Sequence, residues 1–281
     1  MVRRRMEKAL GDAVIKGNLQ EVEKLIEAKT DIHAEVTGDV DFDSMFPEYE
    51  YTDGMAPIFV AAQLGHTKIT EALVKAGAKI DGEAYIGCGS GPRGRRRLQA
   101  IHLAAGMGRT KTVEALVELN ADVSARAEVS IDGHPGDNIE YPGYDCPIHF
   151  AADYGHAETV EALVRLNADV ESRASYEIER FNSHEKYWDL FQEMEPIHIA
   201  AWRGHVQVVR TLVSLGASVE AEGSMEQSGP ERHIELKFFT LISAASGMKT
   251  LYLPRVLCSV RAPPCENLTY LSYPRVCVCV C

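Results

Sequence analysis

A segment of 23 residues occurs in four related copies in this chain, and this repeat restricts the possible folds more than any other feature. The clearest copy, IHFAADYGHAETVEALVRLNADV, starts at Ile148, and related lines start at Ile58, Ile101 and Ile197. A catalytic motif is usually written once, whereas a recurring unit is typical of stacked repeats that bury apolar surface against one another. We therefore expect a solenoid rather than a single globular core.

Each copy has the residues of two short helices joined by a glycine turn. The turn glycine recurs at intervals of 48, 43, 47 and 49 residues, and a pair of alanines precedes it in the last four cases. After it, apolar residues such as Val160, Leu163 and Val164 fall at helical spacing and predict one buried stripe. The second helix then reaches a residue type that readily takes the left-handed conformation ending a helix: Gly77, Asn120, Asn167 or Gly216.

These residues resemble the ankyrin repeat. The segment from Cys146 to Val170 contains the family's proline–apolar–histidine, alanine-pair and glycine–histidine elements. The resemblance covers about residues 6–222 and implies an all-α ankyrin-repeat solenoid, in which β-hairpin fingers connect successive helix pairs. We expect a degenerate cap repeat and four full repeats, at about residues 6–33, 55–82, 99–126, 146–173 and 195–222.

The chain departs from the family pattern where the first helix of each repeat begins. The family's threonine is replaced by Ala56, Gln99, Cys146 or Glu195, and Ala100 stands where proline is expected. Loss of a hydroxyl cap typically costs about 1 kcal/mol per helix. We therefore expect the fold to form with a smaller stability margin than an idealised array.

The intervals exceed the usual period of about 33 residues, and the surplus lies in the fingers. The first and third fingers are acidic, the second carries Arg93, Arg95, Arg96 and Arg97, and the fourth is rich in aromatic residues. Because long surface loops cost little stability and often carry recognition, we hypothesise that the fingers supply partner specificity.

The fourth finger has the spacing of a helix. Its apolar residues recur at helical intervals, and two polar residues before them offer a capping box. The apolar positions are Tyr187, Leu190, Phe191 and Met194, and the capping pair is Asn182 and Glu185.

Composition excludes several classes of protein. A net charge of −12 disfavours binding to nucleic acid or to an anionic membrane, because it repels phosphate. No apolar stretch follows the N-terminus, and only Cys88 and Cys146 lie in the first 257 residues. We expect a monomeric cytoplasmic protein without a disulfide framework.

Two patterns resemble metal sites, but neither predicts one. Six histidines recur at fixed repeat positions, whose spacing between stacked helices of about 8–10 Å is too wide for a shared zinc ion. Structural hydrogen bonds are the favoured interpretation of these histidines. Asp39, Asp41, Asp43 and Glu50 match a calcium-loop spacing, but Ser44 replaces the turn glycine, which favours a solvated acidic finger. The sequence predicts neither a metal nor another cofactor.

Partner-binding candidates come from the resemblance, which implies that the two residues after each alanine pair face a concave groove. From this set we select residues that are apolar or enriched at interface hot spots: Leu64, Met107, Tyr154, Trp202 and Arg203. An interpretation of equal weight is that Trp202 only packs beneath the fourth finger and does not contact a partner. The arginines from Arg93 to Arg97 are a further candidate, as a localisation signal, a phosphate contact or a solvated loop.

The pattern fades after Glu222. Residues 223–281 are expected to be an irregular tail rather than a folded domain, with a truncated repeat start at about 240–247. Alternating Cys and Val near the end is what a repetitive TG tract encodes, which suggests a faulty gene model from about Met248.

Taken together, these features predict a non-catalytic module that binds another protein through concave helix faces and elongated fingers. No phosphate-cradling loop, nucleophile elbow or Cys–His pair supports an enzyme. The alternative is the regulatory ankyrin region of a larger enzyme or channel that the gene model has truncated. A nuclear co-regulator is a third interpretation and depends on Arg93 to Arg97.

Overall fold

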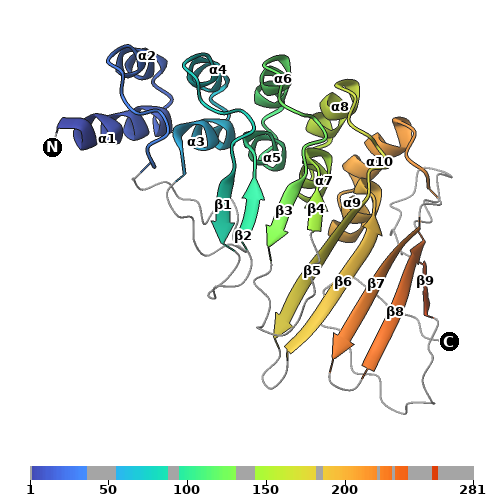
Figure 1. Ribbon diagram of the computed structural model, residues 1–281. Helices are drawn as coiled ribbons and strands as arrows, with labels where there is room; N and C mark the ends of the chain where they lie inside the picture. Colours follow the sequence, from blue (N-terminus) through green and yellow to red (C-terminus); the bar gives the residue numbers. More distant parts are fainter. Residues whose placement is uncertain are drawn as a thin grey trace.

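The chain forms a row of helix pairs with antiparallel strands extending from one side (Figure 1). The structure is a computed structural model. It describes residues 2–36, 55–87, 95–130, 143–181, 186–219, 222–229, 232–239 and 255–258.

Ten helices in the described residues make five consecutive pairs. The first helices of the pairs are α1 (Val2–Ile15), α3 (Pro57–Leu64), α5 (Ala100–Gly106), α7 (Pro147–Asp153) and α9 (Pro196–Arg203). The second helices are α2 (Leu19–Glu27), α4 (Thr67–Lys75), α6 (Thr110–Glu118), α8 (Ala157–Arg165) and α10 (Val206–Ser214). The predicted helical solenoid is confirmed.

Local chemistry explains where these helices start and stop. Pro57, Pro147 and Pro196 each occupy the first turn of a first helix, where a missing N–H costs nothing. Asn120 and Asn167 follow second helices with φ of 72° and 73°, in the left-handed conformation that the sequence predicts for them.

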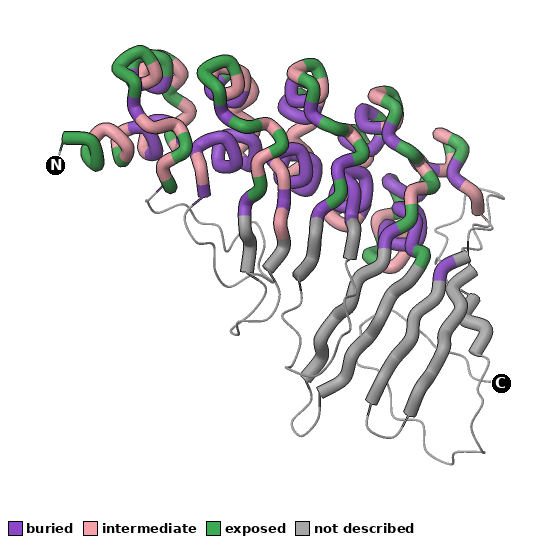
Figure 2. The backbone as a smooth tube through the Cα atoms, viewed as in Figure 1, coloured by how far each residue is buried: buried purple, intermediate pink, exposed green. Residues whose placement is uncertain are grey.

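The core lies between the two layers of helices and runs along the whole row. First helices pack on neighbouring first helices and second helices on second helices, and the buried surface follows the facing sides (Figure 2). The alanine pairs of α3, α5 and α7 are fully buried, which lets these helices approach closely. In the last repeat Ala200 is fully buried but Ala201 is only half-buried.

Hydrogen bonds from the residue after each turn glycine tie one repeat to the next. The Nε2 atoms of His66, His156 and His205 lie 3.4, 2.9 and 2.8 Å from backbone carbonyl oxygens of the preceding repeat. Arg109 occupies this position in the third repeat, and its Nε donates to the carbonyl oxygen of Gln63 at 3.1 Å. The structural interpretation of these histidines is therefore confirmed.

Threonine pairs make a second link between second helices. The hydroxyl oxygens of Thr67 and Thr112 lie 2.8 Å apart, and those of Thr110 and Thr159 are separated by the same distance. Thr112 and Thr159 are almost completely buried. At the next interface the equivalent positions hold Ala157 and Val208, so both polar partners are replaced together.

Within the described residues, the strands of the fingers and of the tail form two antiparallel sheets. The first sheet has the order β1-β2-β3-β4, with β1 (Ala84–Gly87), β2 (Arg95–Leu98), β3 (Ala127–Ser130) and β4 (Gly143–Asp145). The second has the order β5-β6-β7-β8-β9, with β5 (Ala174–Phe181), β6 (Lys186–Met194), β7 (Glu222–Gly229), β8 (Arg232–Phe239) and β9 (Arg255–Cys258). The second and third fingers therefore share backbone hydrogen bonds through β2 and β3, and the fourth finger shares them with the following hairpin through β6 and β7.

The prediction of a helix in the fourth finger is wrong. Tyr187, Leu190, Phe191 and Met194 lie in strand β6, which pairs with β5 on one side and β7 on the other. Two neighbouring strands satisfy its backbone hydrogen bonds, and aromatic side chains favour strands, so the ladder overrides the helical spacing. The expected capping pair, Asn182 and Glu185, lies outside the described residues.

The tail also differs from the expectation at its described residues. The segments at 222–229, 232–239 and 255–258 are strands β7, β8 and β9 of the second sheet rather than irregular chain. The expected repeat start at about 240–247 and the calcium-like spacing from Asp39 to Glu50 lie outside the described residues.

Candidate functional site

The predicted partner-binding residues lie at equivalent places, where the first helix of each repeat ends. Leu64 is the last residue of α3, Met107 and Tyr154 cap α5 and α7, and Trp202 lies in the last turn of α9. All four are half-buried. Leu64, Met107 and Tyr154 pack one side against the core, so their remaining surface is held in a defined position. We call these four residues the groove row.

Arg203 extends the groove row through an ion pair with the preceding repeat. Its Nε lies 2.6 Å from Asp153 Oδ1 and its Nη2 lies 3.1 Å from Asp153 Oδ2, which is a two-pronged geometry that fixes the guanidinium plane. The carbonyl oxygen of Asp153 also lies 2.8 Å from His205 Nε2. The last repeat therefore holds Asp153 by both its side chain and its backbone.

Two other positions expected to face the groove are buried instead. Gln63 is only 1% exposed, and among the described residues its side-chain amide has no hydrogen-bond partner. Gly106 is buried beneath the next repeat, since a Cβ added there would lie 3.6 Å from Tyr154 Cδ2. The expectation is wrong at these two positions because both are buried, and at Gly106 the covering side chain, Tyr154, belongs to the next repeat.

The arginines of the second finger are distributed along strand β2. Arg95 and Arg97 pair with Ser130 and Glu128 of β3, in backbone register. Arg97 also lies near the root of the finger, with its Nη1 3.4 Å from Glu83 Oε2. Arg96 belongs to the same strand, whereas Arg93 lies outside the described residues.

The buried histidines of the first helices serve as caps. The N–H of Gln99 donates to His102 Nδ1 at 3.0 Å, and equivalent bonds of 3.1 and 3.0 Å reach His149 and His198. Burial lowers the pKa of His102 to about 4, so this imidazole is neutral at pH 7. With Nδ1 accepting, its Nε2 donates to the carbonyl oxygen of Ala125 at 2.9 Å. These bonds satisfy the backbone N–H of the N-cap residue, which is a different donor from the first-turn N–H that a threonine hydroxyl would accept from.

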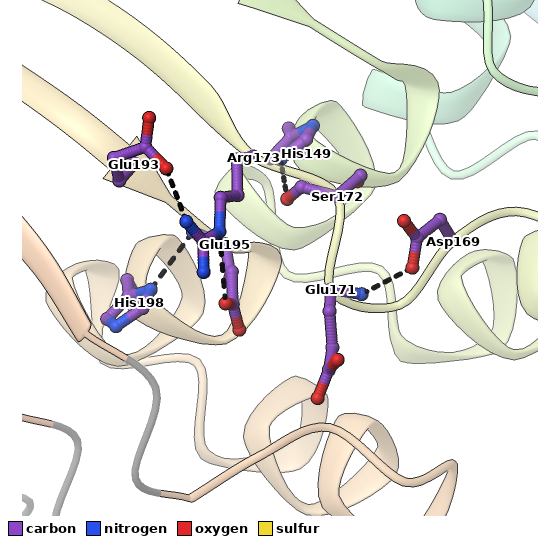
Figure 3. A network of polar contacts seen from close by, with 8 residues as sticks. All are labelled: His149, Asp169, Glu171, Ser172, Arg173, Glu193, Glu195 and His198. Carbon is purple, nitrogen blue, oxygen red and sulfur yellow. Dashed lines mark hydrogen bonds and ion pairs between the residues drawn. The ribbon is translucent and has the colours of Figure 1, made fainter.

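A polar cluster that the sequence did not single out lies where the fourth finger meets the last repeat (Figure 3). Arg173 Nη1 lies 2.6 Å from Glu193 Oε2, and Arg173 Nε lies 3.8 Å from Glu195 Oε1. Glu195 is the N-cap residue of α9, and its side chain is only 5% exposed. Burial raises its pKa to about 6, helped by the nearby negative charge of Glu171.

One sequence signal pointed toward this cluster. Glu195 replaces the family's threonine, and a carboxylate at a position that becomes buried is uncommon. Its partners could not be read from that signal, because Arg173 belongs to the preceding repeat. Across the described part of the chain, no group of three His, Cys, Asp or Glu side chains is arranged to hold a metal ion.

The described helices include none with the length and apolar character needed to cross a membrane. No curated protein sequence matches the chain closely enough to count as a relative. A family model described as ankyrin repeats in three copies matches residues 10–127 and again residues 127–223, which is most of the chain. This match agrees with the helix pairs, glycine turns and fingers of the structure. The chain therefore belongs to the ankyrin repeat family.

Proposed function

We propose that this chain is a non-catalytic module that binds another protein along the groove row. Ankyrin repeats are generally protein–protein interaction modules and are typically non-catalytic. The observation that carries the proposal is the recurrence of a half-exposed apolar or aromatic side chain at the end of four successive first helices. Tyr and Trp are enriched at interface hot spots, and here they stand on a packed scaffold.

Pre-organisation supports this role. Leu64, Met107 and Tyr154 already pack against the core, and the ion pair with Asp153 orients Arg203. Side chains that are ordered before binding lose less conformational entropy when a partner docks. The groove row can therefore contribute its apolar surface to an interface without a large ordering cost.

The fingers provide the second part of the proposed interface. Arg93, Arg95, Arg96 and Arg97 place positive charge on the second finger of a chain whose net charge is −12. Such a local reversal of charge favours a partner with an acidic region. Pairing of β2 with β3 joins this finger to the next one in a single sheet.

Affinity capture with the full-length chain tests this proposal. We would compare the wild-type chain with a Tyr154→Ala/Trp202→Ala variant by quantitative mass spectrometry of the captured proteins. The expected result is at least one protein whose recovery falls about tenfold or more in the variant, as loss of hot-spot side chains predicts. Arg95→Ala/Arg96→Ala, tested in parallel, is expected to weaken capture of the same protein.

A matched control removes two exposed side chains from an outer helix. Lys111→Ala/Glu118→Ala alters α6 on its solvent side and is expected to leave recovery unchanged. Circular dichroism melting of each variant checks that the array remains folded. Capture that is equal in the wild-type chain and in the folded Tyr154→Ala/Trp202→Ala variant would show that the groove row is not the binding surface.

A further inference from the structure

The base of the fourth finger carries an excess of negative charge. We call the group formed by Asp169, Glu171, Arg173, Glu193 and Glu195 the Glu195 cluster. It contains four carboxylates and one guanidinium, drawn from the loop after α8, strand β6 and the N-cap of α9 (Figure 3). The single cation pairs closely with Glu193, at 2.6 Å, and only loosely with Glu195, at 3.8 Å.

One side-chain oxygen of Glu195 accepts no hydrogen bond from the described residues. Its Oε2 atom is buried and has no hydrogen-bond partner among them. A buried acceptor without a donor costs free energy, so an unsatisfied group in a native structure requires an explanation such as an absent ligand. The side chain is 95% buried, since only 5% of it is exposed, so bulk water cannot solvate the oxygen freely.

The electrostatic environment of Glu195 identifies the kind of ligand. After burial, the largest influence on its pKa is repulsion by Glu171, which outweighs the attraction of Arg173, and Asp169 adds further repulsion. The resident arginine therefore does not neutralise the cluster. A second positive charge would relieve this repulsion and supply the donor that Oε2 lacks.

We propose that the Glu195 cluster binds a lysine or arginine side chain of a partner protein. The ammonium or guanidinium group donates to Glu195 Oε2 and approaches past Glu193 and Arg173, whose side chains are 57% and 59% exposed. A bare metal ion fits less well, because the described residues provide no group of three metal-binding side chains. The inference rests on the proposed protein-binding function and adds the chemistry of the bound segment.

The position of the cluster fits a partner segment that also reaches the groove row. Glu195 caps the start of α9, and Trp202 lies in its last turn. At 1.5 Å per residue, the backbone positions of Glu195 and Trp202 are about 10 Å apart along the helix. An extended segment of about four residues spans that distance, so one short peptide can place a basic side chain and an apolar side chain together.

Selection of peptides on the full-length chain tests the inference. A display library of random dodecapeptides would be selected on the wild-type chain, and the strongest peptide would be synthesised. We expect lysine or arginine to be enriched in the selected sequences. Replacing the basic residue by citrulline or acetyl-lysine, which removes the charge, is expected to weaken binding about tenfold in calorimetry.

A double-mutant cycle then assigns the contact. Glu195→Gln is expected to weaken the basic peptide about tenfold and to have little further effect on the neutral peptide, because both changes remove the same interaction. Glu118→Gln, an exposed carboxylate on α6, is the matched control and is expected to change neither affinity. Glu193→Gln, at a largely exposed position, serves as a second probe of the cluster if Glu195→Gln does not fold.

The outcomes separate this inference from the proposed function. Peptides without basic residues, or basic peptides that bind equally to the wild-type, Glu195→Gln and Glu193→Gln chains, would overturn the inference and leave the protein-binding role intact. Failure to select any peptide would contradict the protein-binding role itself, and the inference with it.

Discussion

The imidazole of His205 lies directly against Gly155 of the preceding repeat. A Cβ added to Gly155 would be 2.8 Å from His205 Nδ1, closer than real Cβ contacts allow. The same relationship joins Gly17 to His66 and Gly108 to His156, while Arg109 covers Gly65. The turn glycine is therefore required for stacking as well as for its left-handed backbone.

The last turn glycine provides an internal control for this relationship. Gly204 has a similar φ of 77°, but no described atom lies within 4 Å of a Cβ built there. Both Gly155→Ala and Gly204→Ala strain the backbone, but only Gly155→Ala displaces a histidine. We expect Gly155→Ala to lower the free energy of unfolding by about 1–3 kcal/mol more than Gly204→Ala. Urea unfolding measures the difference, and equal losses would contradict the stacking role.

Arg109 is expected to be replaceable by the residue that its position holds in other repeats. Arg109→His restores an imidazole beside the Gln63 carbonyl, whereas Arg109→Ala removes the donor. We expect Arg109→Ala to cost about 1 kcal/mol or more, the usual range for a lost hydrogen bond with a buried acceptor. Arg109→His should keep most of that stability. Thermal melting of the two variants compares them, and identical melting temperatures would argue against an inter-repeat bond.

The hydroxyl pair of Thr67 and Thr112 is expected to show energetic coupling. Thr112→Val alone leaves Thr67 without its partner, so we expect a loss of about 1 kcal/mol. Adding Thr67→Ala reproduces the apolar pairing of Ala157 with Val208 and should recover part of the loss. The coupling energy from a double-mutant cycle is expected to be about 0.5–1 kcal/mol. Additive single-variant losses would indicate that the two hydroxyls act independently.

Acid is expected to destabilise the array through His102. Burial lowers its pKa from 6.5 to about 4, so between these values the unfolded chain binds a proton that the folded chain does not. The contribution of neutral His102 to the free energy of unfolding is therefore complete above pH 6.5. It is lost as the pH falls toward 4, and the loss is on the order of 3 kcal/mol. The pKa of His149 is lowered for the same reason, and it adds a loss of the same sign.

Unfolding measured from pH 7 to pH 4 in the wild-type chain and in His102→Asn tests this expectation. The variant starts less stable because the cap is altered, but its stability should fall less steeply over this range. A slope equal to that of the wild-type chain would show that His102 does not carry the pH dependence.

Much of the fold was predictable from the sequence because its causes are local. Pro57, Pro147 and Pro196 begin helices, and Asn120 and Asn167 end them, through backbone preferences that each residue carries wherever it stands. The positions of the groove row could also be read from the sequence, because its members follow an alanine pair that recurs in every full repeat, and their role in binding stays a prediction. The burial of Gln63 and Gly106 was not predicted, because it arises from tertiary packing.

Pairing between segments distant in the sequence could not be predicted from such local preferences. The apolar spacing from Tyr187 to Met194 suits a helix, but the hydrogen-bonding partners of β6 lie in β5 and β7 and make it a strand. The charge of Glu195 was visible in the sequence, but its burial and its distance from Arg173 arise only when the fourth and fifth repeats stack.

By itself the sequence determined the repeating helix pair, its turns and the order of the array, because those depend on residues a few positions apart. Only the tertiary structure decided how the fingers pair, which polar groups become buried and where an acceptor is left without a donor. Those outcomes depend on contacts between surfaces of different repeats. The free energy of such contacts cannot be read from one segment alone.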